Sequence, residues 1–249
     1  MTLRSRRVYK IGGPALDDPQ LLNGLALEIK TFDGDLALVH GGGRQVERML
    51  TQLGIESKFI DGRRATSRAA MEIVEMVLSG SMNKALTSGL CRAGVPAVGL
   101  SGRDGSLIRA ALLPGLGCVG APDQVNLSVL DALWTAGFVP VLSPVSSDTD
   151  GAAVNVNADE AAQWVARSIG AETLVFLSDV DGVVLDGEPV PELHEKNLRA
   201  RLNDGSIHGG MALKVRMALD AVRSGIPSVV IAGRSRLSSG FPGTRICLS

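Results

Sequence analysis

Short apolar runs that alternate with helical patterns restrict the possible folds of this chain more than any other feature. The runs are rich in Val, Leu and Ile, and turn or helix signals separate them. They cover residues 8–11, 36–39, 97–100, 139–142, 174–177 and 228–231. Short runs without polar alternation are typical of strands that are buried on both faces. The chain is therefore expected to contain a mainly parallel sheet.

Helical patterns occupy most of the segments between these strands. Asp18 and Pro19 are the residue types that favour the cap and the first position of a helix. Further patterns lie near residues 44–53, 67–93, 124–136, 158–169 and 211–224. Because strands and helices alternate, the sequence predicts an α/β fold whose sheet is covered by helices on both faces.

Two segments interrupt this alternation. Residues 58–66 and 103–120 contain turn glycines between short strand patterns, which predicts hairpin insertions over the N-terminal half. No linker is visible from composition, so residues 1–249 are expected to form one domain. The element order favours, at most, a division into two lobes, 1–172 and 173–249.

Composition argues against several classes of protein. The formal net charge is −1 and aromatic residues make up 3% of the chain, unlike a general nucleic-acid binder or a base-stacking platform. No segment reaches the ~18–20 apolar residues of a membrane span, and the N-terminus lacks the apolar stretch of a signal peptide. The three cysteines lack the spacing of a zinc site. We expect a cytoplasmic protein that binds neither nucleic acid, nor membrane, nor a structural metal.

The longest helical pattern, 67–93, has little polar surface. Its polar residues Glu72, Glu75, Ser79 and Asn83 fall on one narrow stripe. A helix of this kind is buried on most sides. It is expected to be a central core helix, and the alternative is that part of it forms the contact of a symmetric dimer.

Two glycine-rich segments follow the first two predicted strands. Lys10 lies near the carboxyl end of the first strand, where open α/β sheets bind ligands, and a buried lysine needs an anionic partner. Gly12 and Gly13 follow it, and Gly41–Gly43 follow the second strand. Such glycines let backbone N–H groups approach an anion, which predicts a phosphate site. The alternative for Lys10 is a lysine whose ammonium group reaches solvent at the strand end. The alternative for Gly41–Gly43 is a tight turn between strand and helix that binds no ligand.

Polar residues in the second half of the chain extend this candidate site. Asn157 and Glu160 have the spacing of a helix capping box. Asp159 therefore fits the first turn of a helix, whereas Asn155 lies outside it and has no structural role there. Lys214 is expected in the first turn of a later helix, where a cation is unfavourable unless an anion binds. The alternative for Asp159 is a carboxylate that the helix dipole alone favours, and the alternative for Lys214 is an exposed lysine without a ligand.

Two adjacent arginines and three widespread motifs complete the inventory. Arg63 or Arg64 could bind a carboxylate through two hydrogen bonds. Residues 115–120 match GxGxxG but follow no strand. His40 precedes three glycines, as in the oxyanion loop of esterases, but the chain has neither a GxSxG elbow nor a Walker A loop. A nucleotide must then be bound in another way.

Taken in order, these segments resemble the amino acid kinase family, and within it the kinases that act on N-acetyl-L-glutamate. The matching strings run from residue 9 to 246. They are YKIGG, LVHGGG, GRRAT, VLSGSMNK, AVGLSGRDGSL, LGCVG, VNVNADEAA, LSDVDGV, GGMALKV and GTRI. The resemblance implies a three-layer αβα sandwich with an N-terminal substrate lobe and a C-terminal ATP lobe. It also implies transfer of the γ-phosphoryl group of ATP to the side-chain carboxylate of N-acetyl-L-glutamate, the second step of arginine biosynthesis.

The resemblance implies a role for each residue that matches a family motif. Lys10 and Lys214 match the lysines that stabilise the phosphoryl group, and Asp159 matches the carboxylate that orients both. Arg64 and Asn155 match residues that bind the amino-acid substrate. The matching loop glycines are Gly12, Gly13 and Gly41 for the phosphate, and Gly42 and Gly43 for the substrate. The nucleotide segments comprise Asp179, Val180, Asp181, Gly182, Val183, Val184, Leu185, Ser206, Ile207, His208, Gly209, Gly210 and Met211.

The implied chemistry needs no general base, because a carboxylate with a pKa of ~4.3 is already ionised at neutral pH. Positive groups and Mg²⁺ carried by ATP would stabilise the transferring phosphoryl group. The resemblance also implies a homodimer. Pro14 departs from the family pattern by removing an N–H from the first glycine loop, and Gly233-Arg234 has no assigned role.

Two alternatives remain open from the sequence. One is a sister kinase that acts on an N-acyl or carrier-linked aminoadipate in lysine biosynthesis, since one methylene supplies only ~1–3 kcal/mol of discrimination. The other is a non-catalytic amino-acid or nucleotide sensor on the same fold.

Overall fold

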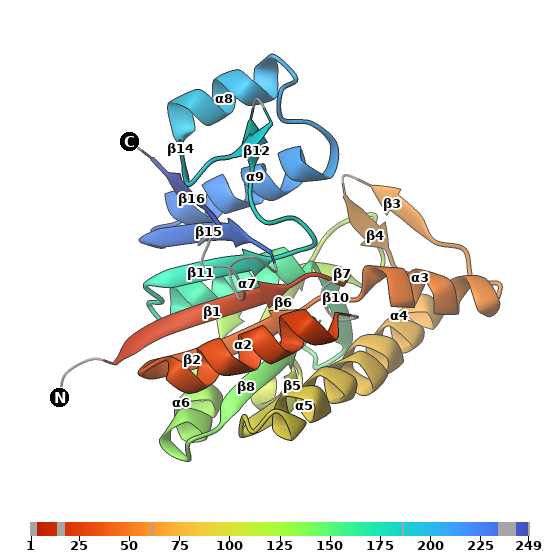
Figure 1. The fold of residues 1–249 in the computed structure, drawn as a ribbon. Helices are drawn as coiled ribbons and strands as arrows, with labels where there is room; N and C mark the ends of the chain where they lie inside the picture. The colour runs from red at the N-terminus through yellow and green to blue at the C-terminus, as the bar shows by residue number, and fades with distance from the viewer. Residues whose placement is uncertain (1–3, 14–17, 61, 186, 234–242, 249) are drawn as a thin grey trace.

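A mainly parallel sheet of eight strands forms the centre of the molecule (Figure 1). The computed structural model describes residues 4–13, 18–60, 62–185, 187–233 and 243–248. In spatial order the strands are β14 (Glu192–His194), β16 (Thr244–Cys247), β15 (Ser228–Ala232), β11 (Thr173–Leu177), β1 (Ser5–Ile11), β2 (Gly34–His40), β8 (Val139–Ser143) and β5 (Ala97–Ser101). Neighbouring strands from β15 to β5 pair in parallel, whereas β16 is antiparallel to β15 and parallel to β14.

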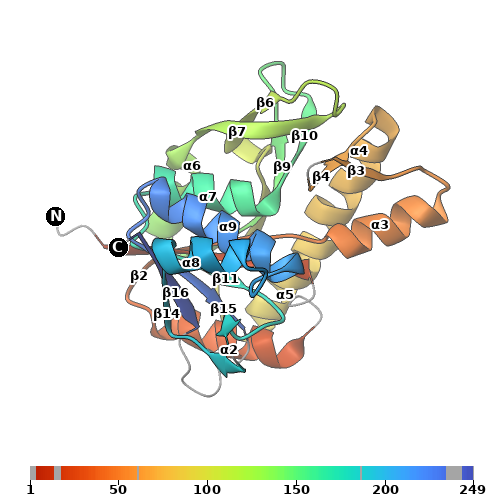
Figure 2. The same ribbon diagram turned by 90° about the horizontal axis from the view of Figure 1, so that it is seen from above.

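Helices cover both faces of this sheet, which confirms the predicted three layers (Figure 2). One face packs against α6 (Leu127–Thr135), α7 (Ala158–Ser168), α8 (Glu195–Asn203) and α9 (Gly209–Arg223). The other packs against α2 (Pro19–Thr31) and α5 (Asn83–Arg92). The Asp18 carboxylate caps α2 by accepting from the N–H groups of Gln20 and Leu21, as the sequence predicts.

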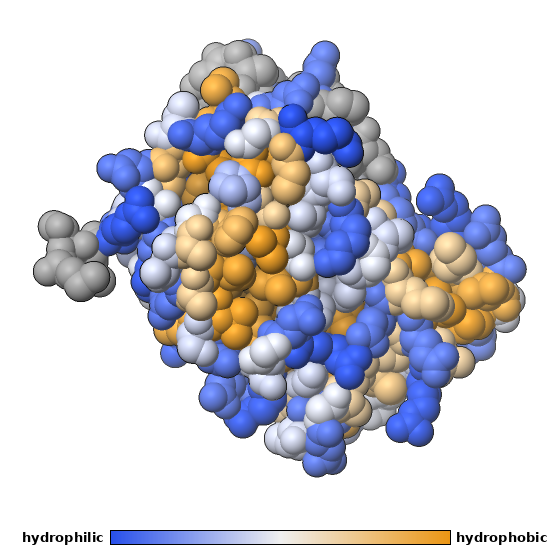
Figure 3. Space-filling view, turned by 90° about the horizontal axis from the view of Figure 1, so that it is seen from below, coloured by the Kyte–Doolittle hydropathy of each residue, from blue (hydrophilic) through white to orange (hydrophobic). Residues whose placement is uncertain are grey.

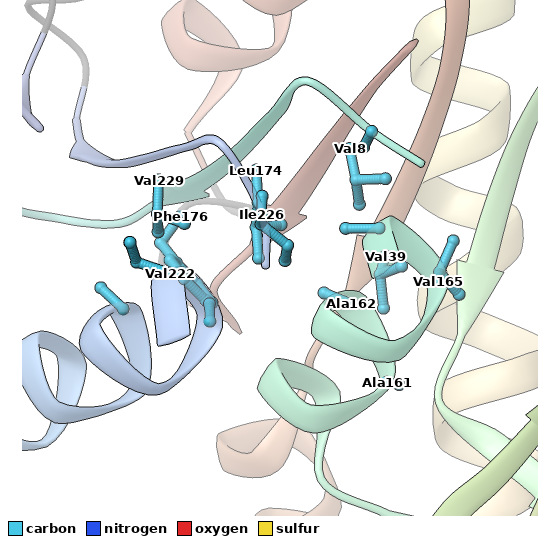
Figure 4. Packing of buried hydrophobic residues seen from close by; sticks show 14 of the residues in the cluster. Val8, Val39, Ala161, Ala162, Val165, Leu174, Phe176, Val222, Ile226 and Val229 are labelled. Atoms are coloured by element: carbon cyan, nitrogen blue, oxygen red, sulfur yellow. The ribbon is translucent and has the colours of Figure 1, made fainter. Parts of the chain in front are cut away.

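Side-chain alternation along β1 assigns Lys10 to one face. Val8 packs in the apolar cluster on the α7 side, whereas Tyr9 and Ile11 pack in the cluster on the α2 side. Figure 4 shows Val8 and Val39 opposite Ala162 and Val165 of α7. Because successive strand residues point to opposite faces, Lys10 shares the face of Val8 and is directed toward α7.

The helix predicted at 67–93 extends from Arg68 to Arg92 and contains a π-helical segment. It consists of α4 (Arg68–Glu75), a π-helical segment (Met76–Met82) and α5. With α3 (Gly43–Gln52) it forms a third apolar cluster around Val46, Leu50 and Val74. Most of its apolar side chains are buried, but Met76 is exposed. Contrary to the expected polar stripe, Asn83 is fully buried.

Apolar side chains also reach the molecular surface. The face seen in Figure 3 carries apolar patches separated by charged residues. Exposed apolar residues are normal on soluble proteins, so these patches do not by themselves identify a dimer contact. The homodimer remains a prediction.

Both predicted hairpin insertions are present. β3 (Lys58–Ile60) pairs with β4 (Arg63–Ala65), and β6 (Ile108–Leu112) pairs with β7 (Val119–Val125), each antiparallel. The second hairpin is part of a closed four-stranded barrel with β9 (Val145–Ser147) and β10 (Ala153–Val156), which the sequence did not predict. β9 and β10 are too short to leave an apolar run. Figure 2 shows this barrel beyond the helical layer of α6 and α7.

Sequence patterns also missed several short elements. One is a one-turn helix at Asp104–Ser106, and the others lie in the C-terminal third: β12 (Val184–Leu185), β13 (Glu188–Pro189), β14, α8 and β16. Leu198 is the buried side chain of α8, so the helix lacks a strong periodic pattern. The central sheet continues across residue 172, and the division into lobes remains a prediction.

No helix in the described part of the chain is long and apolar enough to cross a membrane. The cytoplasmic location remains a prediction. Two residues to which the sequence analysis drew attention, Pro14 and Arg234, lie outside the described residues.

Candidate active site

The two predicted glycine loops meet at the carboxyl edge of the central sheet. The Gly12 N–H donates to the Leu177 carbonyl at 3.0 Å, and the Gly41 N–H donates to the Ile11 carbonyl at 2.9 Å. A Cβ placed on Gly13 would lie 3.8 Å from the Gly42 Cα. The loops after β1 and β2 are therefore in contact, as expected for strands that end at one edge.

Lys10 forms an ion pair with Asp159 across this edge. The Nζ–Oδ1 distance is 2.8 Å, and the two side chains are 16% and 23% exposed. Asp159 lies in the first turn of α7, whose cap Asn157 accepts from the Asp159 N–H at 2.8 Å. Asn157 thus fixes the start of the helix, and Asp159 supplies the anionic partner that a largely buried lysine requires.

Lys214 of α9 lines one cavity together with Lys10 and Asp159. Its place in the helix and its partner both differ from the expected ones. Because α9 begins at Gly209, Lys214 lies in its second turn rather than its first. Its Nζ contacts the Asp179 carboxylate at 3.1 Å, and this hydrogen bond lowers the pKa of Asp179. In the described residues Asp159 pairs with Lys10 alone, so the expectation that Asp159 orients both lysines is wrong for this structure.

These groups line a cavity of about 320 Å³, termed here the lysine cavity. Its walls are Lys10, Gly12, Gly13, Asp159, Phe176, Leu177, Ser178, Asp179, Gly210, Leu213, Lys214 and Met217. The charges of its two lysines are balanced by Asp159 and Asp179, and the N-terminal part of α9 adds positive potential. The cavity is suited to a polyanion such as a nucleotide phosphate chain.

A second cavity of about 140 Å³, termed here the arginine cavity, lies on the other side of the glycine loops. Its walls are Gly41, Gly42, Gly43, Val46, Phe59, Gly62, Arg63, Arg64, Val74, Leu78, Val119, Pro144, Asn155, Val156, Asn157 and Ala158. The structure therefore brings together the four residues predicted to bind the amino-acid substrate: Gly42, Gly43, Arg64 and Asn155.

Arg64 is buried and already hydrogen-bonded. Its guanidinium donates to the Glu47 carboxylate, to the Ser57 hydroxyl and to the Gly43 carbonyl, the last at 3.1 Å. It also lies over the Phe59 ring, 4.6 Å from the centroid. The hydrogen bond from Arg64 lowers the pKa of Glu47. Glu47 thus shows that this guanidinium accommodates a carboxylate, and a substrate carboxylate would have to join or replace it.

Asn155 is connected to Arg64 through one intermediate residue. Its Nδ2 donates to the Thr66 hydroxyl at 3.0 Å, and that hydroxyl donates to the Arg64 carbonyl at 2.7 Å. The Asn155 side chain is thereby oriented at the wall of the cavity. The helix-capping pattern gave Asn155 no structural role, and the structure shows that it lies at the cavity wall, held by Thr66.

Arg63, the alternative carboxylate ligand, lies on the same wall but is paired elsewhere. Its guanidinium contacts the Glu160 carboxylate at 2.5 Å. Burial raises the pKa of Glu160, and the nearby Arg63 opposes that shift. This pair connects the β3–β4 hairpin to α7 across the arginine cavity.

Comparison with known proteins identifies the family. A sequence model described as the amino acid kinase family matches residues 5–232. The chain belongs to the amino acid kinase family. This result confirms the resemblance inferred from the motifs.

Relatives and solved structures agree with this assignment. The chain is 43% identical to an acetylglutamate kinase of Rubrobacter xylanophilus, over 96% of this chain and 94% of that protein. It is 42% identical to an acetylglutamate kinase of Chloroflexus aggregans, over 96% and 95%. Among solved structures, a protein from Streptococcus mutans has a TM-score of 0.83 at 25% identity, over 98% and 99%. A carbamate kinase of Giardia, at 16% identity, has a TM-score of 0.68 over the full length of both chains and shows the shared fold.

The nucleotide segments predicted for this member of the amino acid kinase family separate into three groups. Asp179 and Gly210 line the lysine cavity. Val183 and Ile207 pack in the apolar cluster instead, so their side chains serve the core. The remaining predicted residues line neither cavity: Val180, Asp181, Gly182, Val184, Leu185, Ser206, His208, Gly209 and Met211. Gly233 packs against the loop that follows β11, because a Cβ on Gly233 would lie 2.5 Å from the Val180 carbonyl oxygen.

Sequence reasoning missed several cavity residues. Ser178 directly follows a predicted strand, so the rule that ligands bind beyond strand ends could have found it. Glu47 and Ser57 hold Arg64 from positions that carry no motif. The apolar walls gave no sequence signal: Phe176, Leu213 and Met217 in the lysine cavity, and Phe59, Val74, Leu78 and Val119 in the arginine cavity.

His40, which precedes the second glycine loop, is a core residue. Its ring is fully buried, its Nδ1 lies 2.8 Å from the Gly41 carbonyl, and its Nε2 lies 3.2 Å from the Asn83 amide nitrogen. This pattern assigns the proton to Nδ1, so that Nε2 accepts from Asn83. Both nitrogens are therefore used in the core, which agrees with rejection of the esterase motif.

Burial lowers the pKa of His40 from 6.5 to about 4. The unfolded chain therefore binds more protons than the folded chain between these values, and stability falls as pH decreases through this window. From pH 7 to pH 5 this group is expected to remove about 1–2 kcal/mol of unfolding free energy. Urea unfolding at both pH values should show a smaller difference for His40→Gln than for the wild type. The control His208→Gln, at an exposed histidine, should keep the wild-type difference; equal differences in all three proteins would contradict the assignment.

Proposed function

We propose that this protein transfers the γ-phosphoryl group of ATP to the side-chain carboxylate of N-acetyl-L-glutamate, as an acetylglutamate kinase of arginine biosynthesis. Relatives with that name are 40–43% identical over at least 90% of the chain. The enzyme would bind the nucleotide in the lysine cavity and the amino-acid substrate in the arginine cavity.

The arrangement of the two cavities is the observation that carries the proposal. A Cβ on Gly41 would lie 3.8 Å from the Ala158 Cβ and 3.9 Å from the Gly13 nitrogen. Ala158 lines the arginine cavity, and the next residue, Asp159, lines the lysine cavity. Glycine backbone and the start of α7 thus form the common wall. Two anionic substrates bound on either side would meet there, which converts their reaction into an effectively unimolecular step.

The residues at this wall fit a transfer between two anions. A carboxylate oxygen of the acceptor forms the new bond to the γ-phosphorus, the bond from that phosphorus to the β–γ bridging oxygen breaks, and ADP leaves. Lys10, Lys214, the Gly13 N–H and the N-terminus of α9 would stabilise the negative charge that spreads over the phosphoryl oxygens. The N–H groups of Gly12 and Gly41 already donate to carbonyls and would hold the loops in place instead. Asp159 and Asp179 would position the two lysines. The acceptor needs no deprotonation, and the buried His40 takes no part.

The protein groups of the lysine cavity suit Mg²⁺ that arrives with the nucleotide. Its two carboxylates, Asp159 and Asp179, are each engaged by a lysine. In the described part of the chain, the cluster of His, Cys and acidic ligands close enough to share a cation lies elsewhere. Magnesium commonly retains nucleotide phosphates as ligands, and it would add positive charge at the phosphates.

The experiment measures ADP release from MgATP with different acceptors, with hydroxylamine to trap the acyl phosphate. N-acetyl-L-glutamate is expected to support turnover, whereas L-glutamate and a reaction without acceptor should not. Faster turnover with N-acetyl-aminoadipate would keep the mechanism and assign the enzyme to lysine biosynthesis instead. ATP binding without turnover on any acceptor would contradict the kinase and favour a sensor.

A further inference from the structure

Three potential metal ligands lie together at one edge of the central sheet. β14 and β16 pair in parallel so that His194 is opposite Cys247, and Glu192 lies two residues before His194 on the same face. One ligand atom from each side chain lies within 4.8 Å of the others, and all three residues are half-buried. None of them lines the lysine or the arginine cavity.

The carboxylate of this cluster is already oriented. Arg245 donates from Nε at 3.1 Å and from Nη2 at 2.5 Å to the same oxygen of Glu192, Oε2. The other oxygen, Oε1, lies 3.0 Å from Nε2 of His194. Arg245 therefore engages one carboxylate oxygen and leaves the other directed into the cluster, as neighbours of metal ligands commonly do.

The histidine contributes a second observation. Its Nδ1 is buried and has no hydrogen-bond partner among the described residues. Buried polar atoms are rarely left unpaired, and an unfilled position for an ion or a water explains such an atom. Nδ1 lies on the opposite side of the ring from Nε2, so it is a separate unsatisfied position, and Nε2 is the nitrogen that faces Glu192 in the cluster.

We propose that Glu192, His194 and Cys247 bind a divalent cation of the zinc class, with water in the fourth position. Thiolate, imidazole and carboxylate together are the ligands that Zn²⁺ prefers. Ligand atoms around one Zn²⁺ lie roughly 3–4 Å apart, since its bonds are about 2.0–2.3 Å long. The ligand atoms now lie within 4.8 Å of one another, so the side chains would need to move closer to reach this spacing. The bound ion would connect β14 to β16 and stabilise this edge.

The sequence predicted no zinc site, because no two of its Cys and His residues have a suitable local spacing. That argument covers ligands that are close along the chain. Here the ligands come from strands far apart in sequence, and only the parallel pairing of β14 with β16 brings them together.

The test titrates the full-length, chelator-treated protein with Co²⁺, which reports thiolate ligation by its absorption spectrum. The wild type should show a thiolate-to-cobalt charge-transfer band and tetrahedral d–d bands at one equivalent, both removed by Zn²⁺. Cys247→Ser should lose the charge-transfer band, and Glu192→Gln, of nearly the same shape, should bind Co²⁺ at least about tenfold more weakly. The matched control Cys91→Ser, at an exposed cysteine on α5, should keep the wild-type spectrum.

A thermal measurement separates ligation from misfolding. Zn²⁺ should raise the Tm of the wild type and of Cys91→Ser, but not that of Cys247→Ser. Absence of the charge-transfer band in the wild type would overturn the proposal. So would a band that survives Cys247→Ser and disappears in Cys91→Ser. These readouts are independent of kinase activity.

Discussion

Lys10→Ala should lower kcat by about 10²–10³, the usual effect of removing one group that stabilises transition-state charge. The Lys10 ammonium lines the lysine cavity and pairs with Asp159 at the start of α7, close to where the transferred phosphoryl group would accumulate negative charge. Lys214→Ala should have an effect of the same order, since Lys214 faces the same cavity from α9. Steady-state kinetics with saturating MgATP and N-acetyl-L-glutamate measure both effects.

The fold should survive these replacements. Lys10 and Lys214 lie at a cavity surface rather than in an apolar cluster. Circular dichroism should therefore remain close to that of the wild type, whereas urea unfolding of Lys10→Ala should show lower stability, because Asp159 then lacks its partner. A matched control is Lys30→Ala on α2, whose ammonium donates to the Ala93 carbonyl away from both cavities. Near wild-type kcat in both cavity variants would contradict the assignment of the active site.

The central sheet and the glycine loops could be predicted because their signals are local. A short apolar run reports a strand that is buried on both faces, and side-chain alternation then assigns each residue to a face. Lys10 interrupts such a run near its end, so its place at the carboxyl edge could be inferred. The capping position of Asn157 placed Asp159 in the first turn of α7 for the same reason.

The pairing of the lysines could not be predicted, because it depends on tertiary geometry. Asp159 and Asp179 are both acidic residues near strand ends, and only the packing of α7 and α9 decides which lysine each one meets. The sequence pattern placed the start of this helix near residue 211, but α9 begins at Gly209. Lys214 therefore lies in the second turn of α9 instead of the first. Glu47, which holds Arg64, carried no motif because its role depends on the distance between α3 and β4.

The four-stranded barrel shows a second limit. Its strands β9 and β10 pair with β6 and β7 from a distant part of the chain. Such short strands are stable only within a sheet that buries their side chains. Asn155 lies on β10, so its position beside Thr66 became visible only with the barrel.

Arg64→Lys should raise the KM for N-acetyl-L-glutamate by about 10- to 100-fold, with a smaller change in kcat. The guanidinium presents two terminal nitrogens in one plane, and Glu47, Ser57 and Gly43 accept from them. A lysine offers a single ammonium and cannot reproduce this fork. Loss of a hydrogen bond to a charged group costs about 1.5–3 kcal/mol, which corresponds to that range in KM.

Two further variants decide whether Arg64 itself binds the substrate. Arg48→Lys, at an exposed position on the same helix as Glu47, should leave the KM for N-acetyl-L-glutamate unchanged. Arg63→Lys tests the neighbouring arginine, which also lines the cavity but is paired with Glu160. If the KM rises for Arg63→Lys and stays constant for Arg64→Lys, the substrate carboxylate binds Arg63. A rise specific to Arg64→Lys would mean that Arg64, rather than Arg63, binds the substrate carboxylate.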